Sequence, residues 1–600
     1  MSDNRASSWY TLAKGIAVIF VLVGVGRIAS TYHTFNQAYD EPAHIACGME
    51  WLDKGTFKIE PQHPPLPRVA VALGPYLAGL RLPEVKFREP THKDGYDFYT
   101  AGNEILYAEG KYGRNLTLAR MGTLPFFVLT AFVTFVWARS LLGEWPAVLA
   151  VFFVTTLPTV LGYCTLAYVD PALLAFLPVA LFAFVRWLDS PSWGRSLILG
   201  TAVAGALLSN TPAMVFLPPC VVAILVCRWW ARRGTGLAGL TVLQSIRQFL
   251  GEWTRPAVIV VVATCFVLWA GYRFSVQPMD QMFEHPAQSV RSSHLPSPVK
   301  AVALKLVALN PSLPAPEFLQ GVYKMLGENS KLYPSYIFGK VKRGGWWYFY
   351  PVMLAFKTPP VFLLLAILGT GWTLTRFFHS EERDWKMAAP AACVLAILLI
   401  AMLLKVNIGV RHVLFLYPLF AILATFACVR VWELRSRWPR VVPRVLVALL
   451  VWVAFSTAWI HPNYLTYTSA LAGRHPDKNL LLDADFDAGQ NILQLSQELA
   501  DRGVKQVHLR LYTSADLTKM NLPPFELLEP NQRATGWIAI SLHNLHTGEN
   551  PWNEADRNSY KWLNGYPGVA DVNKTIRLFL IEEGEQPKGG NAPSGATPGK

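Results

Sequence analysis

Long apolar runs recur along the chain, and most approach the ~20 residues that an α-helix needs to cross a bilayer. The stretch from Ser196 to Trp230 is too long for one helix, and the sequence SNTP at 209–212 predicts a break in it. This pattern predicts a polytopic α-helical membrane protein with about eleven transmembrane helices. They are expected near residues 12–31, 116–138, 145–163, 166–187, 196–210, 212–230, 256–272, 349–375, 387–404, 411–430 and 442–460.

Arginines gather in the loops after the second, fourth, sixth, eighth and tenth apolar runs, which all lie on one side of the membrane. Because positively charged loops stay in the cytoplasm, this side and the N-terminus are predicted to be cytoplasmic. The first run has no small-residue cleavage site after it, so we interpret it as a retained span rather than a signal peptide. The protein is therefore expected in the inner or plasma membrane of the cell.

Three long segments then lie outside the cytoplasm, at 32–115, 273–348 and 461–600. The third alternates β-like runs (QVHLRLY, GWIAIS, TIRLFLI) with a helical stretch near 489–501, which predicts a small extracytoplasmic α/β domain. The expected division is a membrane domain at 1–460, the α/β domain at 461–583 and a disordered Pro/Gly-rich tail at 584–600.

The amino-acid composition supports a membrane protein and argues against nucleic acid as a partner. The 600 residues are 52% hydrophobic and only 16% charged, with a mean hydropathy of +0.27. The net charge of +14 does not indicate nucleic acid, because the arginines follow the loops between spans. The seven cysteines form no CxxC pair or even spacing, so neither disulfides nor a cysteine zinc site is predicted.

The sequence YDEPAH at 39–44 places two adjacent carboxylates at the start of the first outer segment. Pro42 suits the first turn of a helix, so Asp40 or Glu41 would sit at its N-cap. Asp40 and His44 would share one helix face, with Gly48 leaving room beside them. One interpretation is an acid that only caps an amphipathic helix. The other is a general base or metal ligand that faces a cavity at the membrane surface.

Two further residues are candidates on the same side of the membrane. His63 in QHPPLPR precedes two prolines that give a rigid, extended entry into another apolar segment, either as a helix cap or as a wall of the same cavity. Asp170 begins the fourth span before a proline, which fits a helix start. An ionisable residue at a membrane boundary is equally a candidate for a functional site.

Cations also occur on the outer side, and together they would suit the phosphate of a lipid headgroup. Lys357 lies about eight residues inside a span, a costly position for an unpaired charge. Arg411 and His412 lie in a short outer loop, where either could instead be an interfacial residue, and Arg273 follows the seventh span. Carboxylates opposite a phosphate-binding cluster suit the transfer of a group from a lipid phosphate.

These motifs resemble, in order and spacing over nearly the whole chain, the GT-C superfamily of integral-membrane glycosyltransferases. Its members include protein O-mannosyltransferases and aminoarabinose transferases. The resemblance rests on YDEPAHIACGMEWLDKG, HPPLPR, GGWWYFYPVMLAFKTPP, NIGVRHVLFLYP and HPNYLTYTSALAG leading to LLDADFDAGQ. Two departures affect details of binding: LLSNTP stands where the family has LLTK or LLSK, and Asp487-Ala488-Gly489-Gln490 stands where it has DWGQ.

The resemblance implies an inverting transferase that takes a sugar from an undecaprenyl- or dolichyl-phosphate donor. Asp40 matches the catalytic base and Glu41 its acidic neighbour, while Lys357, Arg411 and His412 match positions near the donor phosphate. No cofactor is certain. A divalent metal ion is compatible with the superfamily, with Glu41, His44 and Asp170 as candidate ligands.

The leading hypothesis is thus a glycosyltransferase whose partners are the bilayer, a polyprenyl-phosphate-sugar donor and an outer acceptor. The residues do not choose between a protein, a lipid and a glycan as acceptor. The alternative is a transporter or flippase for a polyprenyl lipid or sugar, which would need polar residues at mid-depth in several spans.

Overall fold

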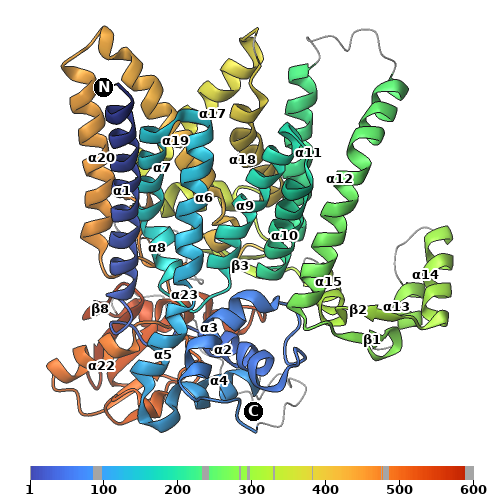
Figure 1. Ribbon diagram of the computed structural model, residues 1–600. Helices are drawn as coiled ribbons and strands as arrows, with labels where there is room; N and C mark the ends of the chain where they lie inside the picture. Colours follow the sequence, from blue (N-terminus) through green and yellow to red (C-terminus); the bar gives the residue numbers. More distant parts are fainter. Residues whose placement is uncertain are drawn as a thin grey trace.

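Long helices run side by side through the upper part of the molecule in Figure 1. The computed structural model describes residues 2–84, 97–232, 242–282, 286–292, 297–328, 331–381, 383–473, 476 and 485–587, so most of the predicted disordered tail, from residue 588 onward, lies outside the described residues. The long helices are α1 (Ser2–Ala29), α6 (Leu124–Leu142), α7 (Glu144–Thr156), α9 (Asp170–Asp189), α10 (Trp193–Ser209), α11 (Pro212–Arg232), α12 (Val242–Gly271), α17 (Pro360–His379), α18 (Trp385–Leu403), α19 (Leu416–Glu433) and α20 (Val441–Ile460). Two shorter helices adjoin them: α8 (Pro158–Cys164) follows α7, and α5 (Tyr112–Met121) precedes α6 at the lower end of the molecule in Figure 1.

The predicted helical membrane fold is confirmed, and each predicted run falls on a helix or a pair of helices. In the described part of the chain, nine stretches are long and apolar enough to span a membrane: Thr11–Ala29, Tyr112–Leu142, Asp170–Asp189, Pro212–Arg232, Trp253–Gly271, Pro360–His379, Trp385–Leu403, Leu416–Ser436 and Val441–Ile460. The pair α7 and α8, bent by 61°, makes a tenth, and α10 is a shorter apolar helix. The chain is an integral membrane protein, and the count of eleven crossings stays a prediction.

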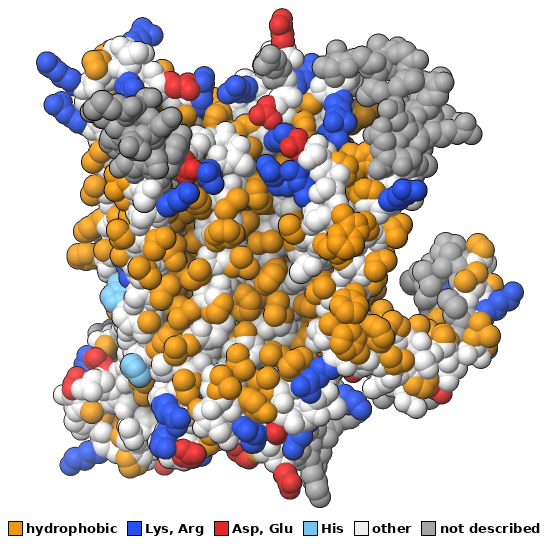
Figure 2. Space-filling view, viewed as in Figure 1, with side chains coloured by type: hydrophobic (Ala, Val, Ile, Leu, Met, Phe, Trp, Pro, Cys, Tyr) orange, Lys and Arg blue, Asp and Glu red, His pale blue; other side chains and the backbone are white. Residues whose placement is uncertain are grey.

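Prolines define where several of these helices begin. A proline occupies the first turn of α6, α8, α9 and α17, where its missing N–H costs no hydrogen bond. The predicted break at SNTP is also present: α10 ends at Ser209, the backbone of its C-cap residue Asn210 is extended, and α11 begins at Pro212. Figure 2 shows the result, a broad hydrophobic belt over the helices with Lys, Arg, Asp and Glu at its two ends.

The first outer segment folds into short helices below the bundle: α2 (Glu41–Met49), a π-helical turn (Glu50–Lys54), α3 (Pro65–Leu77) and α4 (Asp97–Tyr107). Two glycines allow their close packing. A Cβ on Gly48 of α2 would lie 1.9 Å from the Arg68 carbonyl oxygen, and one on Gly102 of α4 would lie 2.0 Å from that of Pro42. The helix that begins at YDEPAH is therefore fixed between α3 and α4.

The predicted second outer segment and the residues that follow it to 357 form two two-stranded antiparallel sheets and short helices, with part of the segment projecting away from the bundle (Figure 1). The elements are β1 (Val276–Pro278), α13 (Pro286–Ser292), α14 (Ser297–Leu309), β2 (Ser312–Pro314), α15 (Pro316–Glu328), β3 (Pro334–Ile337), β4 (Lys340–Arg343) and α16 (Phe349–Lys357). Strand β3 pairs with β4, from Pro334 opposite Arg343 to Ile337 opposite Lys340.

The predicted small C-terminal α/β domain is confirmed, and it packs at the end of the bundle opposite the one where α1 begins (Figure 1). Its five-stranded sheet has the order β6-β5-β7-β9-β8. Strands β5 and β6, and β5 and β7, are parallel, whereas β9 runs antiparallel to β7 and β8. The elements are α22 (Ile492–Asp501), β5 (Val507–Arg510), β6 (Phe525–Leu527), β7 (Gly536–Ser541), α23 (Leu542–Thr547), β8 (Ala570–Val572) and β9 (Ile576–Ile581).

Candidate functional site

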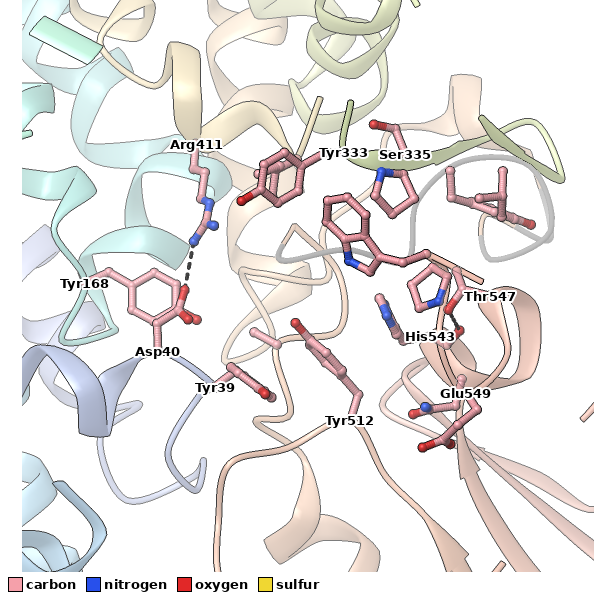
Figure 3. Close-up of a pocket in the computed structure, with 18 residues that line it drawn as sticks. Tyr39, Asp40, Tyr168, Tyr333, Ser335, Arg411, Tyr512, His543, Thr547 and Glu549 are labelled. Atoms are coloured by element: carbon pink, nitrogen blue, oxygen red, sulfur yellow. Dashed lines mark hydrogen bonds and ion pairs between the residues drawn. The ribbon is translucent and has the colours of Figure 1, made fainter. Parts of the chain in front are cut away.

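A cavity of about 360 Å³ lies where the first outer segment, the loop before α19, the β3–β4 hairpin and the C-terminal domain meet. Figure 3 shows the charged side chains of Asp40 and Arg411 together at one end of it. The cavity is lined by Tyr39, Asp40, Tyr168, Tyr333, Pro334, Ser335, Tyr336, Val341, Ile408, Arg411, Ala488, Tyr512, His543, Asn544, Thr547, Glu549, Pro551 and Trp552. Segments from five parts of the sequence therefore build one partly open site, since Tyr168 adds the segment before α9.

Asp40 directs its carboxylate into this cavity rather than onto the helix that follows it. It occupies the N-cap position of α2, but its side chain makes no capping hydrogen bond. Instead Oδ2 lies 3.1 Å from Nη1 of Arg411, and the Tyr99 hydroxyl donates to Oδ1 at 3.4 Å. The side chain keeps 28% of its surface exposed. Of the two interpretations of this acid, the geometry favours the one that faces a cavity.

The C-terminal domain holds the backbone on the N-terminal side of Asp40. The Tyr39 amide donates to the Ala488 carbonyl oxygen at 2.8 Å, and the Ser514 hydroxyl donates to the Tyr39 carbonyl oxygen at 2.6 Å. The Tyr39 ring stacks on that of Tyr512, with centroids 4.8 Å apart and planes 12° from parallel. The position of Asp40 thus depends on two segments far away in the sequence.

Glu41, the adjacent acid, is fully buried and faces away from the cavity. Arg120 of α5 donates to both of its carboxylate oxygens, at 2.9 and 2.8 Å. The backbone amides of Ala38 and Ala167 each donate to one oxygen at 2.7 Å. A bidentate arginine and two amides occupy the acceptor positions of the carboxylate, so Glu41 ties α2 to α5 and to the segment before α9.

His44 and His63 belong to a buried polar cluster with Glu60 and Arg68. Arg68 donates from Nε to Nδ1 of His44 at 3.3 Å and also forms an ion pair with Glu60, which contacts His63 Nδ1 at 2.9 Å. Burial and the Arg68 charge lower the pKa of His44 well below its usual value. Burial would raise the pKa of Glu60, but the charges of Arg68 and His63 more than offset it and lower this pKa.

Arg411 is the cation of the cavity. It interacts electrostatically with Asp170, the first residue of α9, as well as with Asp40, and its Nε has no hydrogen-bond partner among the described residues. Its loop is fixed by Asp485, which accepts from the Val410 amide at 2.6 Å. A Cβ on Gly409 would lie 2.6 Å from that carboxylate, so glycine is needed there.

The remaining predicted residues lie outside the cavity lining. Lys357 ends α16 and is buried, and its Nζ donates to the carbonyl oxygens of Leu465 and Asp485 at 2.7 Å each. Arg273 lies over the Trp51 ring, with Cζ 4.4 Å from the centroid. His412 follows Arg411 but does not line the cavity. Asp40 and Arg411 are thus brought together directly, with Asp170 nearby.

Sequence reasoning did not identify the partners of these residues. Arg120 has a signal in the sequence, because in the predicted orientation it is an arginine at the outer start of a span, where the positive-inside rule disfavours it. No sequence signal marks the lining residues of the C-terminal domain, because only the tertiary fold brings them to the cavity. They include Tyr512, His543, Asn544 and Trp552.

The candidate metal ligands do not fit a metal ion. The oxygens of Glu41 are occupied by Arg120 and two amides, and His44 accepts from Arg68. Within the described ranges, no group of three His, Cys, Asp or Glu side chains could hold a metal.

A protein-family model described as dolichyl-phosphate-mannose-protein mannosyltransferase matches residues 112–250. This match confirms the resemblance to protein O-mannosyltransferases that the sequence motifs indicated. It includes Asp170 and Arg120 but neither Asp40 nor Arg411, so it does not test their roles. No curated protein matches the chain.

Three kinds of solved structure are similar to the chain at low identity. ArnT from Cupriavidus metallidurans bound to undecaprenyl phosphate has 13% identity and a TM-score of 0.46, with 94% of this chain and 98% of that one covered. The Archaeoglobus fulgidus oligosaccharyltransferase tethered to an acceptor peptide has 11% identity and a TM-score of 0.40, with 88% of this chain and 62% of that one covered. The S. cerevisiae protein O-mannosyltransferase Pmt1–Pmt2 complex bound to the sugar donor has 13% identity and a TM-score of 0.32, with 47% of this chain and 37% of that one covered.

Proposed function

We propose that the protein transfers a sugar from a polyprenyl-phosphate-linked donor to an acceptor hydroxyl on the outer side of the membrane, with Asp40 as the general base. The observation that carries the proposal is the Asp40 carboxylate, which lines a cavity with Arg411, its Oδ2 lying 3.1 Å from the Arg411 Nη1. The arginine-rich loops and the N-terminus then lie in the cytoplasm, and the C-terminal domain lies outside.

Arg411 gives the cavity a binding group for the donor phosphate. A guanidinium has five N–H donors in a planar fork that matches phosphate oxygens. Only Nη1 contacts Asp40, and Nε has no partner among the residues described. A bound phosphate therefore competes with Asp40 for Arg411, and it leaves the carboxylate free to accept a proton.

The reaction needs one proton transfer and one displacement. The acceptor oxygen attacks the anomeric carbon of the donor sugar as its proton passes to Asp40. The bond from that carbon to the phosphate oxygen breaks, and the polyprenyl phosphate leaves with the electron pair of that bond. Arg411 stabilises the charge that develops on the leaving oxygen. Attack from the face opposite the leaving group inverts the anomeric carbon.

Mass spectrometry of envelope glycans, lipids and glycoproteins from a deletion strain tests this function. The strain is expected to lack one sugar modification, which the wild-type gene restores. Asp40→Asn should not restore it, although the variant should reach the membrane in normal amount. The matched control is Glu109→Gln, at an exposed acid of the same segment whose partner is Lys111.

Two results would contradict the proposal. Full restoration by Asp40→Asn would show that Asp40 is not the base. Movement of a labelled polyprenyl-phosphate sugar across proteoliposomes, with no transfer product in the presence of membrane extract, would indicate the transporter instead.

A further inference from the structure

The half of the cavity that lies away from Asp40 is built by the β3–β4 hairpin and the C-terminal domain, and the donor chemistry does not use it. Figure 3 shows Ser335, His543, Thr547 and Glu549 on this side, across the cavity from Asp40. We call it the distal half; its lining also includes Tyr333, Tyr336, Asn544 and Trp552.

Aromatic rings form the walls of this half. The Tyr512 ring continues the stack from Tyr39 to His543, whose ring centroid is 4.2 Å away at 23°. On another side, Tyr333 packs edge-to-face against Trp552 at 4.9 Å. Rigid aromatic rings that carry polar tips contact ligands with both an apolar surface and hydrogen-bonding groups. A sugar ring has this character, because its C–H faces are apolar and its rim carries hydroxyls.

Two buried polar atoms in the lining lack partners. Ser335 Oγ and Asn544 Oδ1 have no hydrogen-bond partner among the described residues, and the two side chains belong to residues only 3% and 6% exposed. Unpaired buried polar atoms are rare and costly, so each calls for an explanation. Both residues line the cavity, so a rotation of each side chain toward it would bring these atoms to hydroxyl groups of a bound ligand, which donate and accept.

The charges of the lining are already paired. Glu549 forms an ion pair with Arg510 and accepts from the Tyr560 hydroxyl at 2.8 Å, while Asp40 pairs with Arg411. The distal half therefore offers no unpaired charge to an ionic ligand among the described lining residues. The cavity volume of about 360 Å³ lies near the lower end of the range for small-molecule sites, about 300–1,000 Å³. Both properties suit a small uncharged ligand with several hydroxyls better than an extended peptide.

We propose that the distal half is the acceptor subsite and that the acceptor is a saccharide. The ring packs against the aromatic walls, Ser335 and Asn544 bind its hydroxyls, and one further hydroxyl is presented to Asp40. This inference rests on the proposed transferase function, because it assigns the acceptor of the same reaction.

Ser335→Ala and Asn544→Leu test the proposal without endangering the fold. Each removes a buried polar atom that has no partner, so thermal stability should stay equal or rise. Loss of one hydrogen bond to the acceptor should slow transfer roughly tenfold at low acceptor concentration. The rate is followed by mass spectrometry in membranes of the complemented deletion strain, which supply native donor and acceptor. Thr425→Val in α19 is the matched control, because its buried hydroxyl also lacks a described partner but lies outside the cavity.

Linkage analysis of the missing modification separates the outcomes. A sugar attached to a saccharide hydroxyl, with both variants slow and stable and the control unaffected, supports the proposal. A sugar on a protein side chain, or full rates in both variants, overturns the saccharide acceptor and leaves the transferase function standing. A deletion strain that lacks no sugar modification overturns the transferase function as well.

Discussion

Two carboxylate–arginine pairs lie next to each other in the structure, and their environments differ. Asp40 and Arg411 meet through one contact in the cavity, with side chains 28% and 17% exposed. Glu41 and Arg120 form a bidentate pair with exposures of 0% and 1%. A carboxylate whose acceptor positions are all filled cannot take a proton from a substrate, whereas one with a single charged contact can. Of these two adjacent acids, Glu41 is thus held in a structural ion pair, and Asp40 is the one whose environment fits the proposed base.

The largest effect is expected at the exposed pair. Asp40→Asn should lower the transfer rate roughly 1,000-fold, because it removes the proton acceptor and leaves a side chain of nearly the same shape. Thermal stability should stay close to that of the wild type. Rates in detergent-solubilised membranes and thermal unfolding measure both quantities. A variant that unfolds rather than loses its rate would place Asp40 in the structural class with Glu41.

Glu41→Gln should mainly reduce stability, by about 3 kcal/mol, because it leaves Arg120 buried without a countercharge. Denaturant unfolding in detergent measures this loss. The control replaces both partners, Glu41→Leu with Arg120→Met, and should recover much of the stability, since no buried charge remains. A stable but inactive Glu41→Gln would break the comparison and make Glu41 a chemical group.

Asp487 is a third acid to compare with Asp40 and Glu41, because it is buried and is held by hydrogen bonds rather than by an arginine. Burial raises its pKa to about 7, while the Gly489 amide, 3.1 Å from Oδ1, acts in the opposite direction. The folded protein therefore binds a proton that the unfolded chain releases near pH 4, so stability falls as pH rises from 5 to 7, by about 2 kcal/mol. Thermal unfolding across this range should show the slope, and Asp487→Asn should remove it. An unchanged slope in this variant would assign it to another group.

The smallest effect is expected at a surface pair. The Glu498 Oε1 of α22 lies 2.6 Å from the Nη2 of Arg502, and the two side chains are 37% and 33% exposed. Glu498→Gln should change stability by less than about 0.5 kcal/mol and leave transfer unaffected, because water and salt screen exposed pairs. The same unfolding and rate measurements apply. A loss as large as that of Glu41→Gln would show that burial does not decide the strength of these pairs.

The apolar pattern predicts most of the helical fold, because span length and prolines act locally. It places Pro42 at the start of a helix, and it finds the strands of the C-terminal domain from their β-like runs. The sequence could not predict which way the side chains of Asp40 and Glu41 point. Asp40 and Glu41 share one local signal, and what separates them is Arg120, 79 residues after Glu41, and Arg411, 371 residues after Asp40.

The partners of Lys357 could not be predicted from the sequence either. The sequence places it about eight residues inside a span and favours a phosphate as its partner, but in the structure it ends α16, before the span-length helix Pro360–His379. The structure supplies two backbone carbonyls, 108 and 128 residues away. Carbonyl acceptors are present at every residue, so no sequence motif marks them.

The hydrogen bond from Ser514 to the Tyr39 backbone has a consequence for biosynthesis. The ribosome makes Ser514 475 residues after Tyr39, when the first helices have long been inserted in the membrane. Until the last domain folds, a nascent chain lacks the two hydrogen bonds that hold the Tyr39 backbone beside Asp40. On the proposed role of Asp40, a chain truncated before Ala488 should insert in the membrane and transfer no sugar.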